Sequence, residues 1–287
     1  HNPYEHNGIK IFGAQGYKLS DEMEEKVEAI VLSKESLPVK TRDQIGMRLH
    51  GMRQMKTDYI DHLLSTVDCD MRGLRVLVDC ANGAASATAP ELFGRFKCYA
   101  DFIHREPNGT NINDRCGSTH LESLGQRVVA GKYDVGVAFD GDADRCLAVD
   151  EDGNMVNGDQ IMGILARSKK REGKLAHDTL VVTVMSNLGL KLALKDMGIA
   201  TVQTNVGDRY VLEEMLRGGY TLGGEQSGHV INREFATTGD GTLTALTLCN
   251  EVVKSGKSLK ELAADFPQLP QTLVNVPNVD KLAAKTN

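Results

Sequence analysis

Three aspartates alternate with small residues in the run Asp140-Gly141-Asp142-Ala143-Asp144, which Arg145 closes. Glycine and alanine leave room for a tight loop, so the three carboxylates can turn inward together. Carboxylates held this close repel one another strongly unless a cation lies between them. Hard carboxylate oxygens suit Mg²⁺ or Ca²⁺, and Mg²⁺ keeps positions free for phosphate oxygens or water. The run therefore predicts a magnesium site formed by Asp140, Asp142 and Asp144.

Three alternatives compete with this interpretation of the acidic run. An EF-hand loop would use Glu151 as its twelfth residue, but Arg145 stands where such a loop needs glycine, and the preceding segment has the pattern of a strand. The D-x-D motif of haloacid-dehalogenase phosphatases continues into a Gly-Thr type of turn, which Asp144-Arg145 does not supply. A solvated acidic turn stays open on these residues alone.

A second constellation places Glu225, Ser227 and His229 among glycines, directly after a predicted strand. Glycines let the backbone approach a ligand. The three side chains supply an acceptor, a hydroxyl and a titratable group, a combination that suits the hydroxyls of a sugar. Taken alone, the run is equally typical of an ordinary polar turn.

Three further elements give weaker signals. Gly207-Asp208-Arg209 opens a predicted helix, whose N-terminus favours anions, although Asp208 is also a good plain helix cap. The run Thr237–Gly241 has the pattern of a capping and turn element. Lys10, on a strand predicted within residues 1–12, would by itself be a surface charge.

Strands and helices alternate along most of the chain and must position these loops. Strands are predicted at 74–79, 134–139, 146–149, 180–185, 200–204 and 220–223, with a hairpin turn at Asp152-Gly153. Helices are predicted at 89–96, 121–129, 186–197, 208–216 and 242–253. This alternation predicts an α/β fold of successive βα domains with mixed, mainly parallel sheets and helices on both faces. The acidic run then lies past the carboxyl end of a strand, where such sheets bind ligands.

The first 68 residues hold too few elements for a core of their own. One helix is expected after Ser20 as its cap, with acidic residues in its first turn and an apolar face formed by Met23, Val27, Ile30 and Val31. A second helix is expected to start near Thr57 or Asp58, with a stripe formed by Tyr59, Ile60, Leu63, Leu64 and Val67. The segment has the pattern of the tail of a domain whose front is absent, and the chain starts without Met.

We therefore expect four parts along the chain. They are residues 1–68, residues 69–156 with the metal loop (Asp140–Arg145), residues 157–268 with the sugar loop (Glu225–His229), and residues 269–287 as a proline-marked linker into a further domain. The net charge of −6 disfavours a nucleic-acid partner, and no apolar run approaches the roughly 18–20 residues of a membrane span. The six cysteines form no C-x-x-C pair, which disfavours a zinc site or a disulfide framework and favours reduced thiols and a cytoplasmic location.

Taken together, four elements resemble the α-D-phosphohexomutase family in order and approximate spacing. They are His1-Asn2-Pro3 with Asn7-Gly8-Ile9-Lys10, the loop Asp140–Arg145, the run Glu225–His229 and the proline-rich end. In that family the first element reads Ser-His-Asn-Pro and the serine carries the phosphate, so this chain starts one residue after it. The resemblance implies four domains around a cleft. The chain would hold the end of domain 1, all of domains 2 and 3, and the first residues of domain 4.

Within the family, runs such as Val206–Val211 and Cys116–His120 look like the branch that acts on glucosamine phosphates. Relatives that act on mannose or glucose phosphates usually carry Met where Gln226 stands and His near Asp208. The resemblance thus implies interconversion of glucosamine 6-phosphate and glucosamine 1-phosphate by phosphoserine-mediated phosphoryl transfer, for UDP-N-acetylglucosamine synthesis. The alternatives are a phosphomannomutase/phosphoglucomutase and a non-catalytic fragment that binds metal and sugar phosphate.

The resemblance also implies roles for individual residues and partners. It assigns catalysis to His1, Lys10, Arg145 and His229, and substrate binding to Gly207, Asp208, Glu225, Ser227 and His229. It implies Mg²⁺ as cofactor, and a glucosamine or glucose 1,6-bisphosphate that phosphorylates the complete enzyme. The partner would be a small sugar phosphate, and the full-length enzyme could form a homodimer. Without the serine, the 287-residue chain is expected to be inactive as a mutase.

Overall fold

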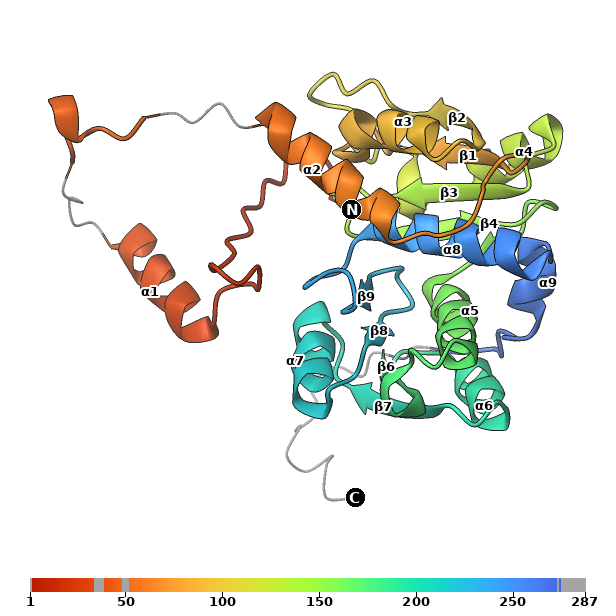
Figure 1. Ribbon diagram of the computed structural model, residues 1–287. Coiled ribbons are helices and arrows are strands. Elements are labelled where there is room, and N and C mark those ends of the chain that lie inside the picture. The colour runs from red at the N-terminus through yellow and green to blue at the C-terminus, as the bar shows by residue number, and fades with distance from the viewer. Residues whose placement is uncertain (1, 34–38, 48–51, 273, 275–287) are drawn as a thin grey trace.

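The computed structural model describes residues 2–33, 39–47, 52–272 and 274, and shows two α/β units side by side (Figure 1). The first unit contains a five-stranded sheet in the order β2-β1-β3-β4-β5. Its strands are β1 (Arg75–Asp79), β2 (Tyr99–Ile103), β3 (Val135–Phe139), β4 (Cys146–Val149) and β5 (Met155–Val156). The first three are parallel to one another, β4 is antiparallel to β3, and β5 is antiparallel to β4.

The second unit contains a four-stranded sheet in the order β7-β6-β8-β9. Its strands are β6 (Thr179–Thr183), β7 (Ala200–Thr204), β8 (Leu222–Gly224) and β9 (Val230–Asn232). Only β9 runs antiparallel to its neighbour. The prediction of mixed, mainly parallel sheets is therefore confirmed.

Helices cover both faces of each sheet, because alternate residues of each strand point to opposite faces. In β1, Val76 and Val78 pack in the same core as α3 (Ala85–Arg95), whereas Leu77 packs in a separate cluster with α4 (Glu122–Gly131). The second sheet has α5 (Gly158–Arg171) and α6 (Leu188–Asp196) toward the main core and α7 (Asp208–Gly218) on the opposite face.

One helix, α8 (Gly241–Ser255), joins the two units. It contacts β3 and β4 of the first sheet and β9 of the second, and the largest apolar core includes residues from both sheets. A short helix, α9 (Leu259–Ala264), follows it and packs on α5. Single 3₁₀ turns occur at Arg42–Gln44, Gly117–Thr119 and Ala176–Asp178.

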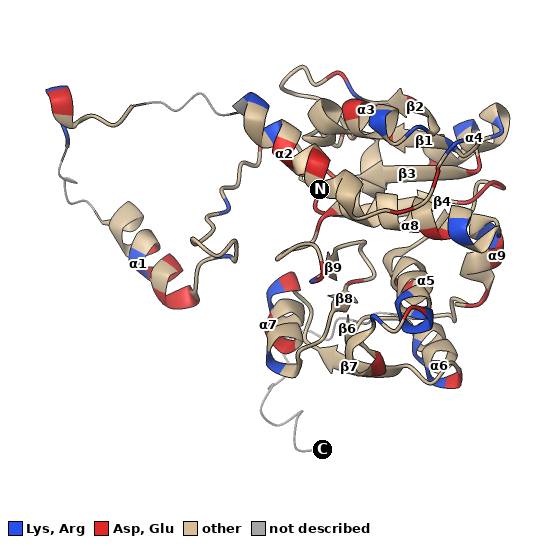
Figure 2. Cartoon of the chain, in the orientation of Figure 1, with Lys and Arg blue, Asp and Glu red and all other residues tan. Residues whose placement is uncertain are grey.

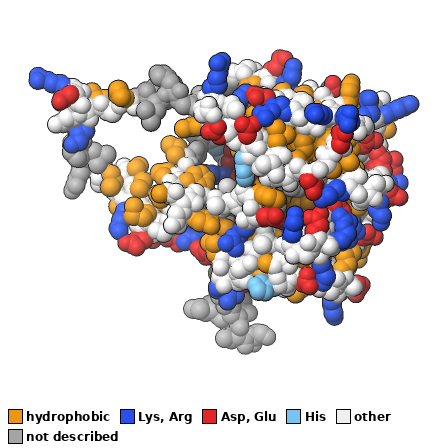
Figure 3. Space-filling model, in the orientation of Figure 1, with side chains coloured by type: hydrophobic (Ala, Val, Ile, Leu, Met, Phe, Trp, Pro, Cys, Tyr) orange, Lys and Arg blue, Asp and Glu red, His pale blue; other side chains and the backbone are white. Residues whose placement is uncertain are grey.

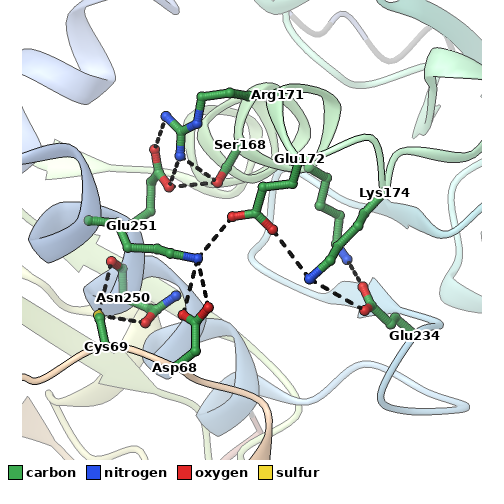
Figure 4. Close-up of polar contacts among 11 residues, drawn as sticks. Asp68, Cys69, Ser168, Arg171, Glu172, Lys174, Glu234, Asn250 and Glu251 are labelled. Atoms are coloured by element: carbon green, nitrogen blue, oxygen red, sulfur yellow. Dashed lines mark hydrogen bonds and ion pairs between the residues drawn. The ribbon is translucent and has the colours of Figure 1, made fainter.

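Polar side chains reinforce this junction (Figure 4). Lys254 of α8 forms ion pairs with Asp68, just past α2 (Met52–Ser65), and with Glu172 at the end of α5. The buried carboxylate of Glu251 accepts hydrogen bonds from Arg171 and from the Ser168 hydroxyl. These contacts hold α2, α5 and α8 together, so the loops at the strand ends have a fixed frame.

The N-terminal segment is less embedded. The first helix, α1 (Asp21–Leu32), lies away from the two sheets (Figure 1), and none of its residues is buried. Its apolar side chains lie at the surface (Figure 3), so the predicted apolar face covers no core here. Ser20 occupies the N-cap position, but its hydroxyl makes no capping hydrogen bond, contrary to the prediction. The ion pair between Asp21 and Arg209 links this helix to α7.

Several predicted boundaries differ from the structure. The second helix begins at Met52 rather than near residue 57, and α3 begins at Ala85 rather than 89. The strand expected before residue 12 is reduced to an isolated bridge between Phe12 and Lys18 among the described residues. The elements β2, α5, β9 and α9 were not predicted. None of the helices in the described parts of the chain is long and apolar enough to cross a membrane.

Candidate functional site

The acidic loop leaves the carboxyl end of β3 and folds back into β4. Ligand oxygens of Asp140, Asp142 and Asp144 all lie within 4.8 Å of one another, as the alternating pattern predicts. An added Cβ at Gly141 would lie 2.7 Å from the side-chain amide nitrogen of Asn113, so a side chain there would displace Asn113. The backbone N–H of Arg145 donates to Asp140 at 3.1 Å and closes the loop.

An ammonium group already lies against two of these carboxylates. The Nζ atom of Lys10 donates to Asp142 Oδ2 at 2.6 Å and to Asp144 Oδ2 at 2.7 Å, across more than 130 residues of sequence. Nothing in the local sequence around Lys10 indicates this contact. The acidic loop thus attracts a cation from elsewhere in the chain, which is the behaviour expected of a cation site.

The electrostatics of the loop agree with this arrangement. Burial, and then repulsion by Asp144 and Asp142, raises the pKa of Asp140 to about 6. Burial also acts to raise the pKa of Asp144, but hydrogen bonds with His229 and Lys10 outweigh it and hold that pKa well below its usual range. Burial would lower the pKa of Lys10, yet its two carboxylate partners raise it. An oxygen cluster that carries excess negative charge fits Mg²⁺.

His229 connects the acidic loop to the second unit. It lies in the turn between β8 and β9 and is only 3% exposed. Its Nδ1 atom is 3.5 Å from Asp144 Oδ2, and its Nε2 atom is 3.7 Å from Asp208 Oδ2. The imidazole therefore lies between one carboxylate from each unit. Gly239 packs against the ring so closely that an added Cβ would lie 2.3 Å from Nε2.

The sugar loop is also held to its surroundings. Glu225 Oε1 accepts a hydrogen bond of 3.0 Å from the backbone N–H of Gly207, which has a φ of 130°. Asp208 pairs with Lys18. Burial acts to raise the pKa of Asp208, but Lys18 and His229 outweigh it and lower that pKa. No local pattern indicates a role for Lys18, because its partner Asp208 lies 190 residues away.

The backbones of the two units meet directly at this site. Gly228 accepts from the N–H of Cys146 at 3.0 Å, and Gly241 donates to the carbonyl of Ala143 at 2.9 Å. A Cβ added at Gly228 would lie 2.5 Å from the carbonyl oxygen of Cys146, and one added at Gly241 would lie 2.3 Å from the carbonyl oxygen of Arg145. Asp240 also caps α8 by accepting from Leu243 N, which confirms the prediction of a capping element.

One cleft of about 800 Å³ is lined by the three aspartates of the acidic loop, Lys10 and His229. It is bordered by the N-terminal segment through Asn2, His6, Asn7, Lys10 and Lys18, by the acidic loop with Arg145, and by Gly207, Asp208, Glu225 and His229. Ser227 is exposed and is not among the residues that line this cleft. His1 lies outside the described residues. Acidic and basic residues are interspersed over the rest of the described chain (Figure 2).

One buried carboxylate beside the sugar loop, that of Asp159, was not predicted from the sequence. Asp159, at the start of α5, accepts from the backbone N–H of Asn187 at 2.7 Å and from Gln226 Nε2 at 3.2 Å. Burial raises its pKa. Its position in the first turn of a helix that opens with a capping box was the available signal.

Comparisons with known proteins point to a single family. Three models described as phosphoglucomutase/phosphomannomutase, alpha/beta/alpha domains I, II and III, match residues 1–38, 57–153 and 157–269. The chain is 66% identical to a phosphoglucosamine mutase of Bifidobacterium animalis subsp. lactis, over 100% of this chain and 64% of that protein. It is 53% identical to one of Caldicellulosiruptor saccharolyticus, over 96% of this chain and 62% of that protein. The chain thus spans less than two thirds of the length of these relatives.

Solved structures show the same fold at low sequence identity. A putative phosphomannomutase from Thermus thermophilus has a TM-score of 0.72 at 24% identity, covering 87% of this chain and 56% of that one. The N-acetylphosphoglucosamine mutase of Aspergillus fumigatus, in complex with GlcNAc-6P and magnesium, has a TM-score of 0.71 at 18% identity, covering 94% and 72%.

Proposed function

This chain belongs to the phosphoglucomutase/phosphomannomutase family, and we propose that it serves the interconversion of glucosamine 6-phosphate and glucosamine 1-phosphate by phosphoserine-mediated phosphoryl transfer. One observation carries the proposal. The three aspartates, Lys10, Asp208 and His229 converge on a single cleft from segments that lie far apart in the sequence. Phosphoryl transfer depends chiefly on positioning and charge neutralisation, and this convergence supplies both.

The phosphate would be handled at the first unit. Asp140, Asp142 and Asp144 would hold Mg²⁺, which would neutralise charge on the transferred phosphoryl group. Lys10 lies against the same carboxylates, so its ammonium is placed to stabilise a phosphate oxygen or to assist proton transfer there. Arg145 lines the cleft beside them and would support the phosphate. His1 is proposed to lie beside the phosphoserine of the complete enzyme.

The sugar would be bound at the second unit. Glu225 is oriented by the Gly207 N–H and presents its carboxylate to the cleft, where it would accept hydrogen bonds from sugar hydroxyls. Ser227, exposed on the same turn, would contribute at the rim. His229 is the proposed acid/base, and its ring lies between Asp144 and Asp208 at the edge of the cleft.

Further proposals concern the whole protein. A glucosamine or glucose 1,6-bisphosphate would phosphorylate the serine, and the cleft volume is ordinary for a small-molecule site, within roughly 300–1,000 Å³. The division at residues 68, 156 and 268, a cytoplasmic location and a homodimer of the full-length enzyme remain proposals. The absence of a nucleic-acid partner is also a proposal, and it depends on the net charge of −6.

The test uses a chimera in which residues 2–272 replace the matching segment of the Bifidobacterium animalis relative. The proposal expects a higher kcat/KM for glucosamine 6-phosphate than for mannose or glucose 6-phosphate. A preference for mannose phosphate would favour the phosphomannomutase/phosphoglucomutase alternative, which the names of the matching family models support. A folded chimera that binds Mg²⁺ but turns over none of these sugars would favour a binding role.

A further inference from the structure

A second group of potential metal ligands lies outside the cleft. Asp79 ends β1, His104 directly follows β2, and Cys116 precedes the 3₁₀ turn at Gly117–Thr119. Since β1 and β2 are adjacent and parallel, their carboxyl ends meet at the same edge of the sheet. None of these three residues lines the 800 Å³ cleft.

The three side chains are close enough to share one ion. One ligand atom from each lies within 4.8 Å of the other two, and Asp79 Oδ2 is 2.9 Å from His104 Nδ1. Asp79 and Cys116 are fully buried, whereas the His104 side chain is 28% exposed. An open pocket lined by Asn82 and His104 reaches the His104 side of the group from solvent.

The backbone fixes two of these ligands before any ion binds. The N–H groups of Ala81 and Gly117 donate to the Asp79 carboxylate at 2.9 Å and 3.0 Å. Gly117 has a φ of 73°, and an added Cβ would lie 2.5 Å from the Phe139 carbonyl oxygen. This close packing holds the neighbouring Cys116 against the sheet edge.

The Cys116 thiol has few competing interactions. Among the described residues it donates no hydrogen bond, and it accepts only a long contact of 3.9 Å from Asn82 Nδ2. Thiol, imidazole and carboxylate together are a mixed donor set. Mg²⁺ and Ca²⁺ prefer oxygen alone, whereas Zn²⁺ accepts sulfur, nitrogen and oxygen in tetrahedral sites.

We propose that Asp79, His104 and Cys116 bind one Zn²⁺ ion, with a fourth position open to water on the His104 side. Zinc displaces the thiol hydrogen of Cys116, which leaves as a proton to solvent. The site does not depend on the proposed mutase function. Zinc would stiffen the loop after β1. This loop contacts the acidic loop, because the Ala84 N–H donates to the Gly141 carbonyl at 2.8 Å.

The experiment is a titration of the metal-free, reduced 287-residue chain with Zn²⁺ in excess Mg²⁺, followed by calorimetry. Replacement by Co²⁺ then reports on the ligands, because a thiolate gives a charge-transfer band. We expect one zinc site and a thiolate–cobalt band. Cys116→Ser should abolish the band and weaken zinc binding by more than about 100-fold, beyond the loss typical of outer-shell changes.

Three variants separate the outcomes. His104→Asn tests the site without changing the buried thiol, and Asn tolerates the φ of 46° at this position; it should weaken zinc binding similarly. Cys98→Ser, a thiol elsewhere in the fold, should bind zinc normally. Asp142→Asn should retain zinc binding. Zinc binding lost in Asp142→Asn but kept in folded His104→Asn would assign the ion to the acidic loop and overturn the proposal, as would the absence of a thiolate band.

Discussion

Replacing Lys10 by methionine should tighten Mg²⁺ binding to the 287-residue chain while impairing catalysis in the chimera. The Lys10 ammonium donates to Asp142 at 2.6 Å and to Asp144 at 2.7 Å, so it competes with a metal for two of the three carboxylates. Its raised pKa keeps it charged throughout the neutral range. Methionine keeps an unbranched side chain only one atom shorter but removes the charge.

The size of the effect follows from Coulomb's law. Two unit charges about 4 Å apart interact by about 1 kcal/mol in water, so a divalent ion and an ammonium at that distance repel by about 2 kcal/mol. This value already includes full screening by water, and because Lys10 and Asp142 are 45% and 53% exposed, salt reduces it further. We expect a gain of about 1 kcal/mol, or roughly fivefold in Kd. If Lys10 instead moves away when the metal binds, its hydrogen bonds to the carboxylates are lost, and this loss also makes Mg²⁺ binding weaker in the parent chain than in Lys10→Met.

Calorimetric Mg²⁺ titration at two salt concentrations measures this gain, which should shrink at high salt. Lys26→Met is a matched control, because Lys26 is paired with Glu22 on α1. In the chimera, Lys10→Met should lower kcat by about 100-fold or more if Lys10 assists proton transfer. Unchanged or weaker Mg²⁺ binding in Lys10→Met would refute the competition.

Three further predictions test the surroundings of the site. The pKa of Asp140 in the folded chain, about 6, exceeds its ordinary value of 3.8. Its contribution to the free energy of unfolding should therefore be present at low pH and lost as the pH rises from about 4 to about 6. The difference in urea stability between the metal-free chain and Asp140→Asn, followed over this pH range, measures that contribution. Asp159→Asn should raise the KM for glucosamine phosphate about tenfold in the chimera, with Mg²⁺ affinity unchanged, because it disturbs the Gln226 contact. Tyr59→Phe should lower the free energy of unfolding by about 1–3 kcal/mol, measured by urea denaturation, because the Tyr59 hydroxyl donates to Asp240 at 2.9 Å.

Each of these has a contrary result, and the second and third also have a control. The exposed Asp196→Asn and Tyr4→Phe serve as matched controls for the second and third predictions. A flat difference curve between pH 4 and 6 would contradict the first. A change in kcat or Mg²⁺ binding without a change in KM would contradict the second. Equal stability of Tyr59→Phe and the control would contradict the third.

Local signals were sufficient for the elements with strong patterns. The run of buried apolar residues in β3 and the Asp-Gly turn before β5 were both predictable, because strand burial and turn chemistry are encoded within a few residues. β2 was missed because its residues are only partly buried and alternate weakly. β9 has three residues, too few for a periodic pattern.

The composition of the site was predictable, but its contacts were not. The alternating aspartates carry their own signal, since their spacing alone brings the oxygens within 4.8 Å. The contact of Lys10 with Asp142 and that of Lys18 with Asp208 depend on how distant segments pack, and no local pattern encodes them. Family resemblance could raise Lys10 to a candidate, but not give it a partner.

The glycines of the site explain why its separate motifs must occur together. Gly228 belongs to the sugar loop and Gly241 to the start of α8, yet both press their backbones against the acidic loop, where any side chain would collide with a carbonyl group. Hydrogen bonds from Cys146 to Gly228 and from Gly241 to Ala143 fix that contact. The metal loop and the sugar loop are therefore one assembly with a set spacing. A substitution such as Gly228→Ala would disturb both the Mg²⁺ ligands and the sugar ligands, although it removes neither.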